Sequence, residues 1–307
     1  MIEYLNHLSK KTELVIQTDQ KGQSWNTIWK MECDQPSGSF KIRGMEHLLS
    51  HHLSLGHTHF VCSSGGNAGY SLAYCAKMFH VNLKVVTPFA LPEHMRKLIE
   101  TQGAKLILKG KDWAEADAYA RKIAHDEGSV YVSPFDDSLL WKGYESIIEE
   151  CAEQMEEPEQ IYLSVGGGGL LMGIWQGLKK VGWKKAQIVT IETPGTASFF
   201  YSNRVGSIYE LDEVSGIATS LAARKVPSAL APLIGHNRIK SKIITDKSAL
   251  HGCRYFFEKF NRIVEPACGA MVSAVRSEFG SEKSRLAIAC GGITMNSEFF
   301  HKTIQTL

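Results

Sequence analysis

Four consecutive glycines, Gly166–Gly169, stand between an apolar run and a stretch with helical spacing. The apolar residues before them predict a buried strand, and the residues from Leu170 predict a helix. Glycines at such a junction leave backbone N–H groups accessible, and the helix N-terminus adds about half a positive charge. The junction is typical of a phosphate-binding loop, although a tight turn is the alternative. Its spacing matches neither a Walker A motif nor G-x-G-x-x-G, which argues against nucleoside triphosphate.

The rest of the 307-residue chain repeats the alternation of short β-branched runs with longer helical stretches. This pattern predicts an α/β fold built from βαβ units around parallel sheets. Gly103, Gly128 and Gly182 each follow a helical stretch, where a left-handed C-cap favours glycine. The predicted strands are His59–Cys62, Leu83–Thr87, Lys105–Leu108, Val130–Ser133, Gln160–Val165, Ile188–Glu192 and Arg285–Cys290, and the predicted helices are Ala68–Phe79, Pro92–Gln102, Trp113–Glu127, Ser138–Gln154, Leu170–Val181, Lys247–Lys259 and Gly269–Phe279.

The composition favours a small-molecule ligand. The 34 Lys and Arg residues nearly balance the 32 Asp and Glu residues, and the basic residues are scattered, so we expect no nucleic-acid partner and no anionic membrane surface. No apolar stretch approaches the roughly 18 residues of a membrane span. The seven cysteines lack C-x-x-C spacing, which predicts reduced thiols in a cytoplasmic protein. The twelve histidines include no H-E-x-x-H pattern, which argues against a metal hydrolase.

Three further segments carry side chains suited to chemistry. Lys41 lies between two apolar residues just after a turn, where partial desolvation would keep its amine nucleophilic. The segment Ser63–Asn67 follows a predicted strand and offers hydroxyl and N–H groups for a carboxylate, although Ser and Asn are also ordinary N-caps. Cys290 ends the last predicted strand, where it is either a weak hydrogen-bonding thiol or a small buried hydrophobe.

Together these segments resemble the pyridoxal-phosphate (PLP) enzymes of fold type II, in particular the serine/threonine dehydratase family and its short L-serine dehydratases with a pyridine-facing cysteine. The resemblance implies the tryptophan synthase β-like fold, with two lobes that each contain an open, twisted, mostly parallel sheet. We place the large lobe at residues 1–40 and 141–307, and the small lobe at 41–140. The matching runs are QPSGSFKIRG (35–44), HFVCSSGGNAG (59–69), PFDD (134–137), LSVGGGGLLMG (163–173), VEPACGA (264–270) and ACGG (289–292).

The resemblance also assigns roles to individual residues. Lys41 would form the Schiff base with the cofactor, and Ser64 would be a second acid/base. Phe40 would pack beside the cofactor ring, Asn67 would bind the ring hydroxyl, and Cys290 with Gly291 would face the pyridine nitrogen. The remaining cofactor-binding residues would be Gly166, Gly167, Gly168 and Gly169 for the phosphate; the substrate-binding residues would be Ser63, Ser64, Gly65, Asn67 and Phe135; and the ligands of a monovalent cation, K⁺, would be Gly166, Glu192, Thr196, Leu221 and Ala223.

The resemblance implies β-elimination of L-serine to pyruvate and ammonia by a homodimer, with L-threonine converted more slowly to 2-oxobutanoate. Serine racemase, threonine synthase, another β-replacement enzyme of the same fold and a non-catalytic PLP-binding protein remain alternatives. Two departures from the family pattern stand out. The N-terminal segment KKTELVIQTDQ lacks the family's Thr-Pro-Leu/Ile run, and Gly65 occupies a position where relatives carry alanine or glycine. Without a methyl group at residue 65, we expect a looser substrate fit and lower turnover.

Overall fold

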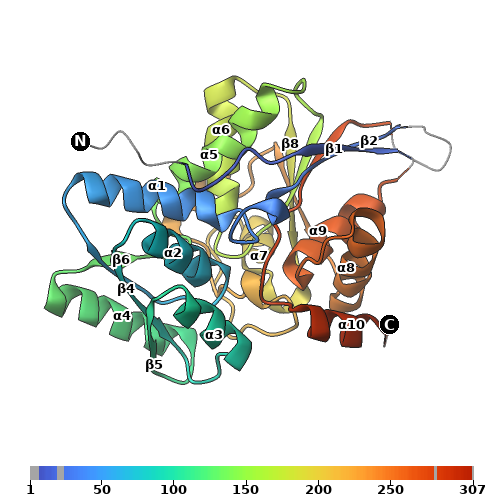
Figure 1. Cartoon of the computed structure of the whole chain (residues 1–307). Helices are drawn as coiled ribbons and strands as arrows, with labels where there is room; N and C mark the ends of the chain where they lie inside the picture. The colour runs from blue at the N-terminus through green and yellow to red at the C-terminus, as the bar shows by residue number, and fades with distance from the viewer. Residues whose placement is uncertain (1–6, 19–23, 280–281, 306–307) are drawn as a thin grey trace.

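The computed structural model describes residues 7–18, 24–279 and 282–305, which form two β-sheets with helices packed on them (Figure 1). The larger sheet has the strand order β1-β2-β10-β7-β8-β9, and the smaller sheet has the order β5-β4-β3-β6. Among the described strands, only β1 and β2 pair antiparallel. The predicted α/β class with mostly parallel sheets is confirmed. The strands are β1 (Leu14–Thr18), β2 (Ser24–Lys30), β3 (His59–Cys62), β4 (Asn82–Thr87), β5 (Lys105–Leu108), β6 (Val130–Val132), β7 (Gln160–Ser164), β8 (Gln187–Glu192), β9 (Ile239–Ile243) and β10 (Arg285–Ile288).

All seven predicted helices are present, with small differences at their ends. The last one is wrong by three residues at its start, because Pro266 occupies the first helical turn, where its missing N–H costs no hydrogen bond. Gly103, Gly128 and Gly182 all adopt the predicted left-handed conformation, with φ of +85°, +65° and +79°. The helices are α1 (Lys41–Ser54), α2 (Asn67–Met78), α3 (Glu93–Thr101), α4 (Trp113–Glu127), α5 (Ser138–Ala152), α6 (Gly169–Val181), α7 (Ser198–Val205), α8 (Asp246–Phe260), α9 (Pro266–Arg276) and α10 (Ser297–Gln305), and the 3₁₀ turns are η1 (Glu32–Asp34), η2 (Pro194–Thr196), η3 (Thr219–Leu221) and η4 (Ser228–Leu233).

The smaller sheet buries both of its faces. Val61 and Val86 belong to a compact apolar cluster with the alanines of α4, whereas Phe60, Cys62 and Val85 face the main core with α2. This division follows from the two-residue period of a strand, in which successive side chains point to opposite faces. The main core continues through α1 and α5 to the larger sheet, so one apolar cluster connects the two sheets.

Helix α1 is held at its N-terminus by a buried cluster of charges. Arg43 donates to Glu32 of η1 at 2.7 Å and to Glu150 of α5 at 2.6 Å, and Lys30 of β2 also donates to Glu150. The two positive charges equal the two negative ones in number. This pairing offsets the desolvation cost of burying the charges, which is several kcal/mol for each unpaired ion. This cluster fixes the start of α1 and therefore the position of Lys41.

The strand content fits the predicted division into lobes, because every strand of the smaller sheet lies between residues 59 and 132. The predicted boundary at 140/141 falls inside α5, so it stays a prediction. Residues 1–6, 19–23, 280–281 and 306–307 of the predicted large lobe lie outside the described part of the chain. Within the described part, no helix has the length and apolar character that crossing a membrane requires.

Candidate functional site

The segment that carries Lys41 is pinned to the loop that follows β10. Phe40 N donates to Cys290 O at 3.2 Å, and Gly292 N donates to Gly38 O at 2.9 Å. Gly38 and Gly291 both have positive φ, and a Cβ on Gly291 would lie 2.3 Å from Gly38 O. The two glycines therefore allow a backbone approach that larger residues would prevent. The structure thus brings Phe40 and Lys41 beside Cys290 and Gly291, residues that are about 250 positions apart in the sequence.

Lys41 is the first residue of α1, and its side chain is half-buried. Its Nζ donates to Pro134 O at 2.7 Å and lies 5.3 Å from the centroid of the Phe40 ring. Burial lowers the pKa of this amine to about 8, while Cys62, Glu265 and Cys290 act in the opposite direction. A lysine with a lowered pKa supplies a neutral amine, the form that attacks a carbonyl, at a lower pH than an exposed lysine does.

The four glycines that precede α6 are each packed too closely for a side chain. A Cβ on Gly166 would lie 2.9 Å from Leu221 Cα, and one on Gly167 would lie 2.2 Å from the Phe135 ring. A Cβ on Gly168, where φ is +80°, would collide with a leucine side chain, and one on Gly169 would lie 2.8 Å from a backbone oxygen. Among the described residues, no side chain caps this end of α6. The loop therefore presents only backbone N–H groups and the helix dipole, as an anion cradle requires.

The loop from residue 63 to 67 divides its side chains between two sides of the sheet. Ser63 Oγ donates to Asp117 of α4 at 2.6 Å, on the side away from Lys41. Ser64 is half-buried, and its Oγ accepts from Gly66 N at 3.4 Å. A Cβ on Gly65 would lie 2.5 Å from a terminal methyl of Leu91. Two hydroxyl groups were predicted to bind a carboxylate. The hydroxyl of Ser64 stays within the loop, whereas that of Ser63 is bound to Asp117 of α4.

Asn67 begins α2 and is held by three segments. Its Oδ1 accepts from Ile293 N at 2.9 Å, and its Nδ2 donates to Glu265 Oε1 at 2.9 Å and to Ser220 Oγ at 3.2 Å. Asn67 therefore connects the loop after β3 with the loop after β10 and with η3. All three lie beside the residues predicted to hold the cofactor.

Phe135 and its neighbours connect the lysine with the glycine loop. The ring of Phe135 lies against Gly167, and its centroid is 6.0 Å from that of the exposed Trp113. Its carbonyl oxygen accepts from Trp141 Nε1 at 2.8 Å. The preceding residue supplies the carbonyl that accepts from Lys41. The structure thus places Phe135 between the two predicted ends of a cofactor.

The thiol of Cys290 is buried, with 7% of the residue exposed. The hydrogen-bonding thiol of Cys268 and then burial raise the pKa of Cys290 well above its ordinary value. Cys290 is therefore a neutral thiol near neutral pH, which offers a ring nitrogen only a weak hydrogen bond and no charge. Cys268 lies in the VEPACGA run, and its thiol contact with Cys290 could not be predicted from the sequence.

Glu265 is a buried acid in this site that the sequence analysis did not assign, with only 3% of the residue exposed. It precedes α9 at the N-cap position, but its side chain makes no capping bond and accepts from Asn67 and Thr294 instead. Burial raises the pKa of Glu265, and these donors partly oppose that rise. The only available signal was its place in the matching run VEPACGA, because Glu before Pro is also an ordinary helix start.

Two of the residues predicted to hold a monovalent cation, Gly166 and Glu192, lie at the ends of the neighbouring strands β7 and β8. Val165 N, just before Gly166, donates to Ile191 O, so the start of the glycine loop lies beside Glu192. Both carboxylate oxygens of Glu192 accept backbone N–H groups at the start of α7, at 2.8 and 2.7 Å. Burial raises the pKa of Glu192 to about 8, an effect that these two N–H groups partly offset. Gly166 packs on Leu221, while Thr196 and Ala223 lie in the adjoining turns.

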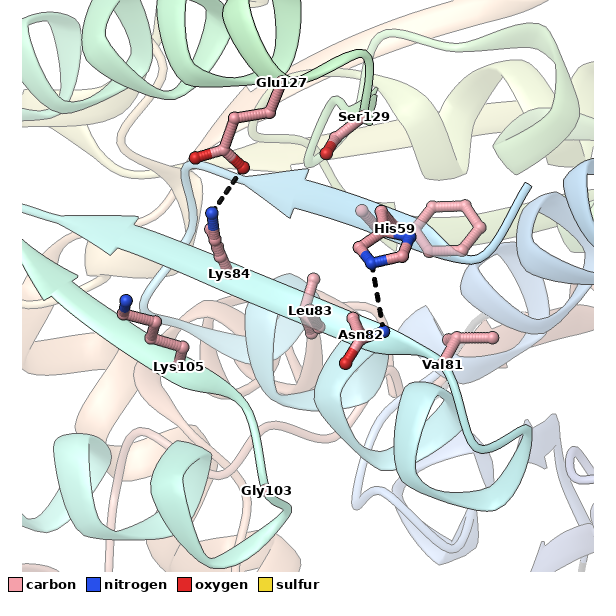
Figure 2. Close-up of a pocket in the computed structure, with 10 residues that line it drawn as sticks. His59, Val81, Asn82, Leu83, Lys84, Gly103, Lys105, Glu127 and Ser129 are labelled. Atoms are coloured by element: carbon pink, nitrogen blue, oxygen red, sulfur yellow. Dashed lines mark hydrogen bonds and ion pairs between the residues drawn. The ribbon is translucent and has the colours of Figure 1, made fainter.

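A separate pocket lies at the opposite, amino-terminal edge of the smaller sheet (Figure 2). It includes His59 and Asn82, which begin β3 and β4 and hydrogen-bond to each other at 3.2 Å. Lys84 in this pocket forms an ion pair with Glu127. Ligands of open α/β sheets bind beyond the carboxyl ends of the strands, where Lys41 and the glycine loop lie. The pocket is therefore distinct from the candidate site.

The arrangement fits a cofactor that has an aldehyde at one end and a phosphate at the other. Lys41 supplies the amine, and the four glycines form a cradle that a single Cβ would fill. Among the described side chains, the hydroxyl of Ser39 is buried beside this segment without a hydrogen-bond partner. The fold and the site together define an α/β enzyme built around a lysine-bound, phosphate-bearing cofactor.

Comparison with known proteins identifies the family. Residues 12–291 match the family described as pyridoxal-phosphate dependent enzyme. The chain is 38% identical over 301 residues to the L-serine dehydratase of Dictyostelium discoideum, which covers 91% of this chain and 86% of that protein. It is 37% identical to the human L-serine dehydratase/L-threonine deaminase over 276 residues, covering 86% of this chain and 84% of that protein. This chain therefore belongs to the pyridoxal-phosphate dependent enzyme family, as its sequence motifs predicted.

A solved structure supports the same assignment. The fungal L-serine ammonia-lyase from Rhizomucor miehei matches with a TM-score of 0.90 at 29% identity, over 98% of this chain and 99% of that one. A maize serine racemase also shares the fold, with a TM-score of 0.86 at 20% identity over 97% of this chain and 92% of that one. PLP fold type II is thus confirmed for this chain.

Proposed function

We propose that this protein is a PLP-dependent L-serine ammonia-lyase that converts L-serine to pyruvate and ammonia, with L-threonine as a slower substrate. The observation that carries the proposal is the position of Lys41, whose amine has a lowered pKa and lies in one loop network with the glycine cradle and Cys290. The names of the relatives support the same reaction, because two relatives at 37–38% identity are named L-serine dehydratase and L-serine dehydratase/L-threonine deaminase.

The cofactor, when bound, supplies an electron sink joined to the substrate Cα. Lys41 would hold the cofactor and, once released by the substrate amine, take the proton from Cα. Its lowered pKa favours the neutral amine that this proton transfer needs. The proton that Lys41 takes from Cα would then pass to the β-hydroxyl, which would leave as water with the C–O electron pair. The enamine product would take up water to give pyruvate and ammonia.

The other predicted residues would bind and orient. Gly166–Gly169 would hold the phosphate through backbone N–H groups, Asn67 the ring hydroxyl, and Phe40 the side of the ring. Ser64 and the loop from 63 to 67 would hold the substrate carboxylate, with Phe135 lining the pocket. Because the side chain of Ser63 bonds to α4, we propose that Ser63 contributes its backbone. Ser64 remains the candidate for a second acid/base.

We further propose K⁺ beside the glycine loop, a homodimer and a cytoplasmic location. Glu192 supports the cation, because among the described residues its buried carboxylate contacts backbone N–H groups and no cationic side chain, and a buried carboxylate gains from a cation. The seven free cysteines support a reducing compartment. The division into a small lobe at 41–140 and a large lobe at 1–40 and 141–307 is likewise a proposal, supported by the two separate sheets.

Pyruvate release tests the proposed reaction. Purified protein is loaded with PLP in potassium buffer, supplied with L-serine or L-threonine, and compared with a Lys41→Ala variant. We expect 2-oxo acid from the unmodified protein alone, and faster from serine. A protein that binds PLP but releases no pyruvate would contradict the proposal. Formation of D-serine in the same samples would identify a racemase instead.

A further inference from the structure

We propose that Glu265 is a positioning residue of this site: its carboxylate fixes the Asn67 amide with the nitrogen directed at the cofactor's ring hydroxyl. The inference rests on the proposed function only in that PLP must bind here, and it does not depend on which amino acid is the substrate. No role for Glu265 follows from the motifs, so the inference comes from the contacts of its side chain.

The carboxylate of Glu265 is placed by three segments that are far apart in the sequence. Oε1 accepts from Asn67 Nδ2 at 2.9 Å, and Oε2 accepts from Thr294 Oγ1 at 2.5 Å. Ser220 of η3 is a further donor to this side chain. A Cβ on Gly292, where φ is +129°, would lie 2.1 Å from Glu265 Cδ. A glycine is therefore required where the loop after β10 passes the carboxylate.

These contacts leave the Asn67 amide a single orientation. Its Oδ1 already accepts from Ile293 N, and both carboxyl oxygens of Glu265 act as acceptors, Oε1 from Asn67 and Oε2 from Thr294. A flipped amide would place its oxygen against Glu265 and its nitrogen against a backbone N–H, which would lose both bonds. One N–H of the Asn67 amide is used by Glu265. The other N–H donates to Oγ of the exposed Ser220 at 3.2 Å. This longer bond is the one that a ring hydroxyl would replace.

The same carboxylate acts on Lys41 through its charge. The groups that bear on the Lys41 amine are Cys62, Glu265 and Cys290, and each opposes the fall in its pKa that burial causes. Burial raises the pKa of the Cys62 thiol to about 12, and that of Cys290 is also well above its ordinary value. Both thiols are therefore neutral near neutral pH. Burial also raises the pKa of Glu265, but the hydrogen bonds from Thr294, Asn67 and Ser220 oppose that rise. As a carboxyl group with three donors, Glu265 is the most acidic of these three groups and the one that carries negative charge toward the lysine–cofactor link.

The test follows the absorbance of bound PLP as a function of pH, together with PLP affinity, in the full chain. Glu265→Gln keeps the shape of the side chain and removes its charge. We expect the pH at which the lysine-linked cofactor changes absorbance to fall by about one unit or more, because a nearby negative charge is lost. We also expect weaker PLP binding, because the amide introduced by Glu265→Gln can donate as well as accept and so tolerates a flipped Asn67. Thr294→Val, which spares the Asn67–Glu265 bond, should change both readouts less.

A purely structural role would lower the melting temperature of Glu265→Gln while leaving the absorbance transition at the pH of the unmodified protein, and that result would overturn the inference. If the Glu265→Gln variant does not fold, the same two measurements are made on the Glu265→Asp variant. Its charge should keep the transition near the original pH, whereas its shorter reach should weaken PLP binding. A Glu265→Asp variant that binds PLP as the unmodified protein does would refute the role toward Asn67. Failure of the unmodified protein to bind PLP would refute the proposed function as well.

Discussion

Lys41 and Arg43 lie two residues apart in the first turn of α1, and they differ in how their charges are compensated. Arg43 is buried and donates to two carboxylates, those of Glu32 and Glu150. Hydrogen bonds from Arg43 and Lys30 outweigh burial and lower the pKa of Glu150. Lys41 donates to a backbone carbonyl, and burial lowers its pKa to about 8. The buried Arg43, which holds the fold, is ion-paired, whereas the Lys41 amine proposed to react forms no ion pair with any residue that the structure describes.

The largest effect should come from removing the unpaired amine. We expect Lys41→Met to lower serine turnover by about a thousandfold, the middle of the range for loss of a general base. The same variant should be more stable than the unmodified protein when no cofactor is bound. The folded pKa of about 8 lies below the ordinary 10.5, so Lys41 destabilises the fold below about pH 8, and this cost disappears as the pH rises to 10.5. Without cofactor, the variant should melt higher at neutral pH. A lower melting temperature there would contradict the comparison.

Removing the paired charge should damage the fold instead. Arg43→Met leaves Glu32 and Glu150 without their shared partner, and we expect the free energy of unfolding to fall by about 3–5 kcal/mol. Urea denaturation of the cofactor-free protein measures this loss. Arg43→Lys is the matched control and should restore only part of it, because an ammonium cannot reproduce the forked geometry of the guanidinium. Unchanged stability of the Arg43→Met variant would show that the charge cluster does not anchor α1.

Glu192 extends the comparison to an unpaired acid. Its folded pKa of about 8 exceeds the ordinary 4.5, so it destabilises the fold increasingly as the pH rises through that interval. A bound K⁺ should offset this cost. We expect KCl to raise the melting temperature by about 2 °C more than choline chloride does at about pH 9, and less at about pH 6. Glu192→Gln should abolish the difference. Equal melting temperatures in both salts would argue against the cation site.

The smallest expected effect is on serine turnover and comes from how closely residue 65 packs around the substrate, not from a charge. A Cβ on residue 65 would press on Leu91 and lie 3.0 Å from Thr87 Cγ2, so Gly65→Ala requires the flexible end of Leu91 to move. We expect the added methyl to tighten the pocket and raise serine turnover about two- to fivefold. Gly66→Ala is the control, because the nearest atoms to its Cβ are 4.0 Å away. Steady-state turnover that is unchanged or lower in Gly65→Ala would refute the expected looseness.

The sequence predicts the elements whose hydrophobic period is clear and misses those whose period is obscured. The seven predicted strands all form, but β1, β2 and β9 were not predicted. In β2, Lys30 is fully buried through its contact with Glu150, which breaks the usual rule that lysine marks an exposed position. Strand β9 (IKSKI) lies at the edge of the larger sheet, and its two lysines flank Ser241, which interrupts the apolar pattern. Both strands depend on tertiary partners that a local pattern does not contain.

The candidate site shows the same limit. Lys41, the glycine loop and Cys290 are recognisable because their motifs are local. The bond between Glu265 and Asn67 joins residues that are 198 positions apart, so no local spacing could reveal it. The direction of Ser63 toward Asp117 likewise depends on α4, which packs on the far face of the smaller sheet.

The most direct test of the central claim is to locate the covalent link. The protein is loaded with PLP, reduced with borohydride, digested and analysed by peptide mass spectrometry. We expect a single stable pyridoxyl group on Lys41, and none in the Lys41→Met variant treated in the same way. A label on another lysine, or no label on protein that binds PLP, would contradict the assignment of Lys41 as the cofactor-bearing residue.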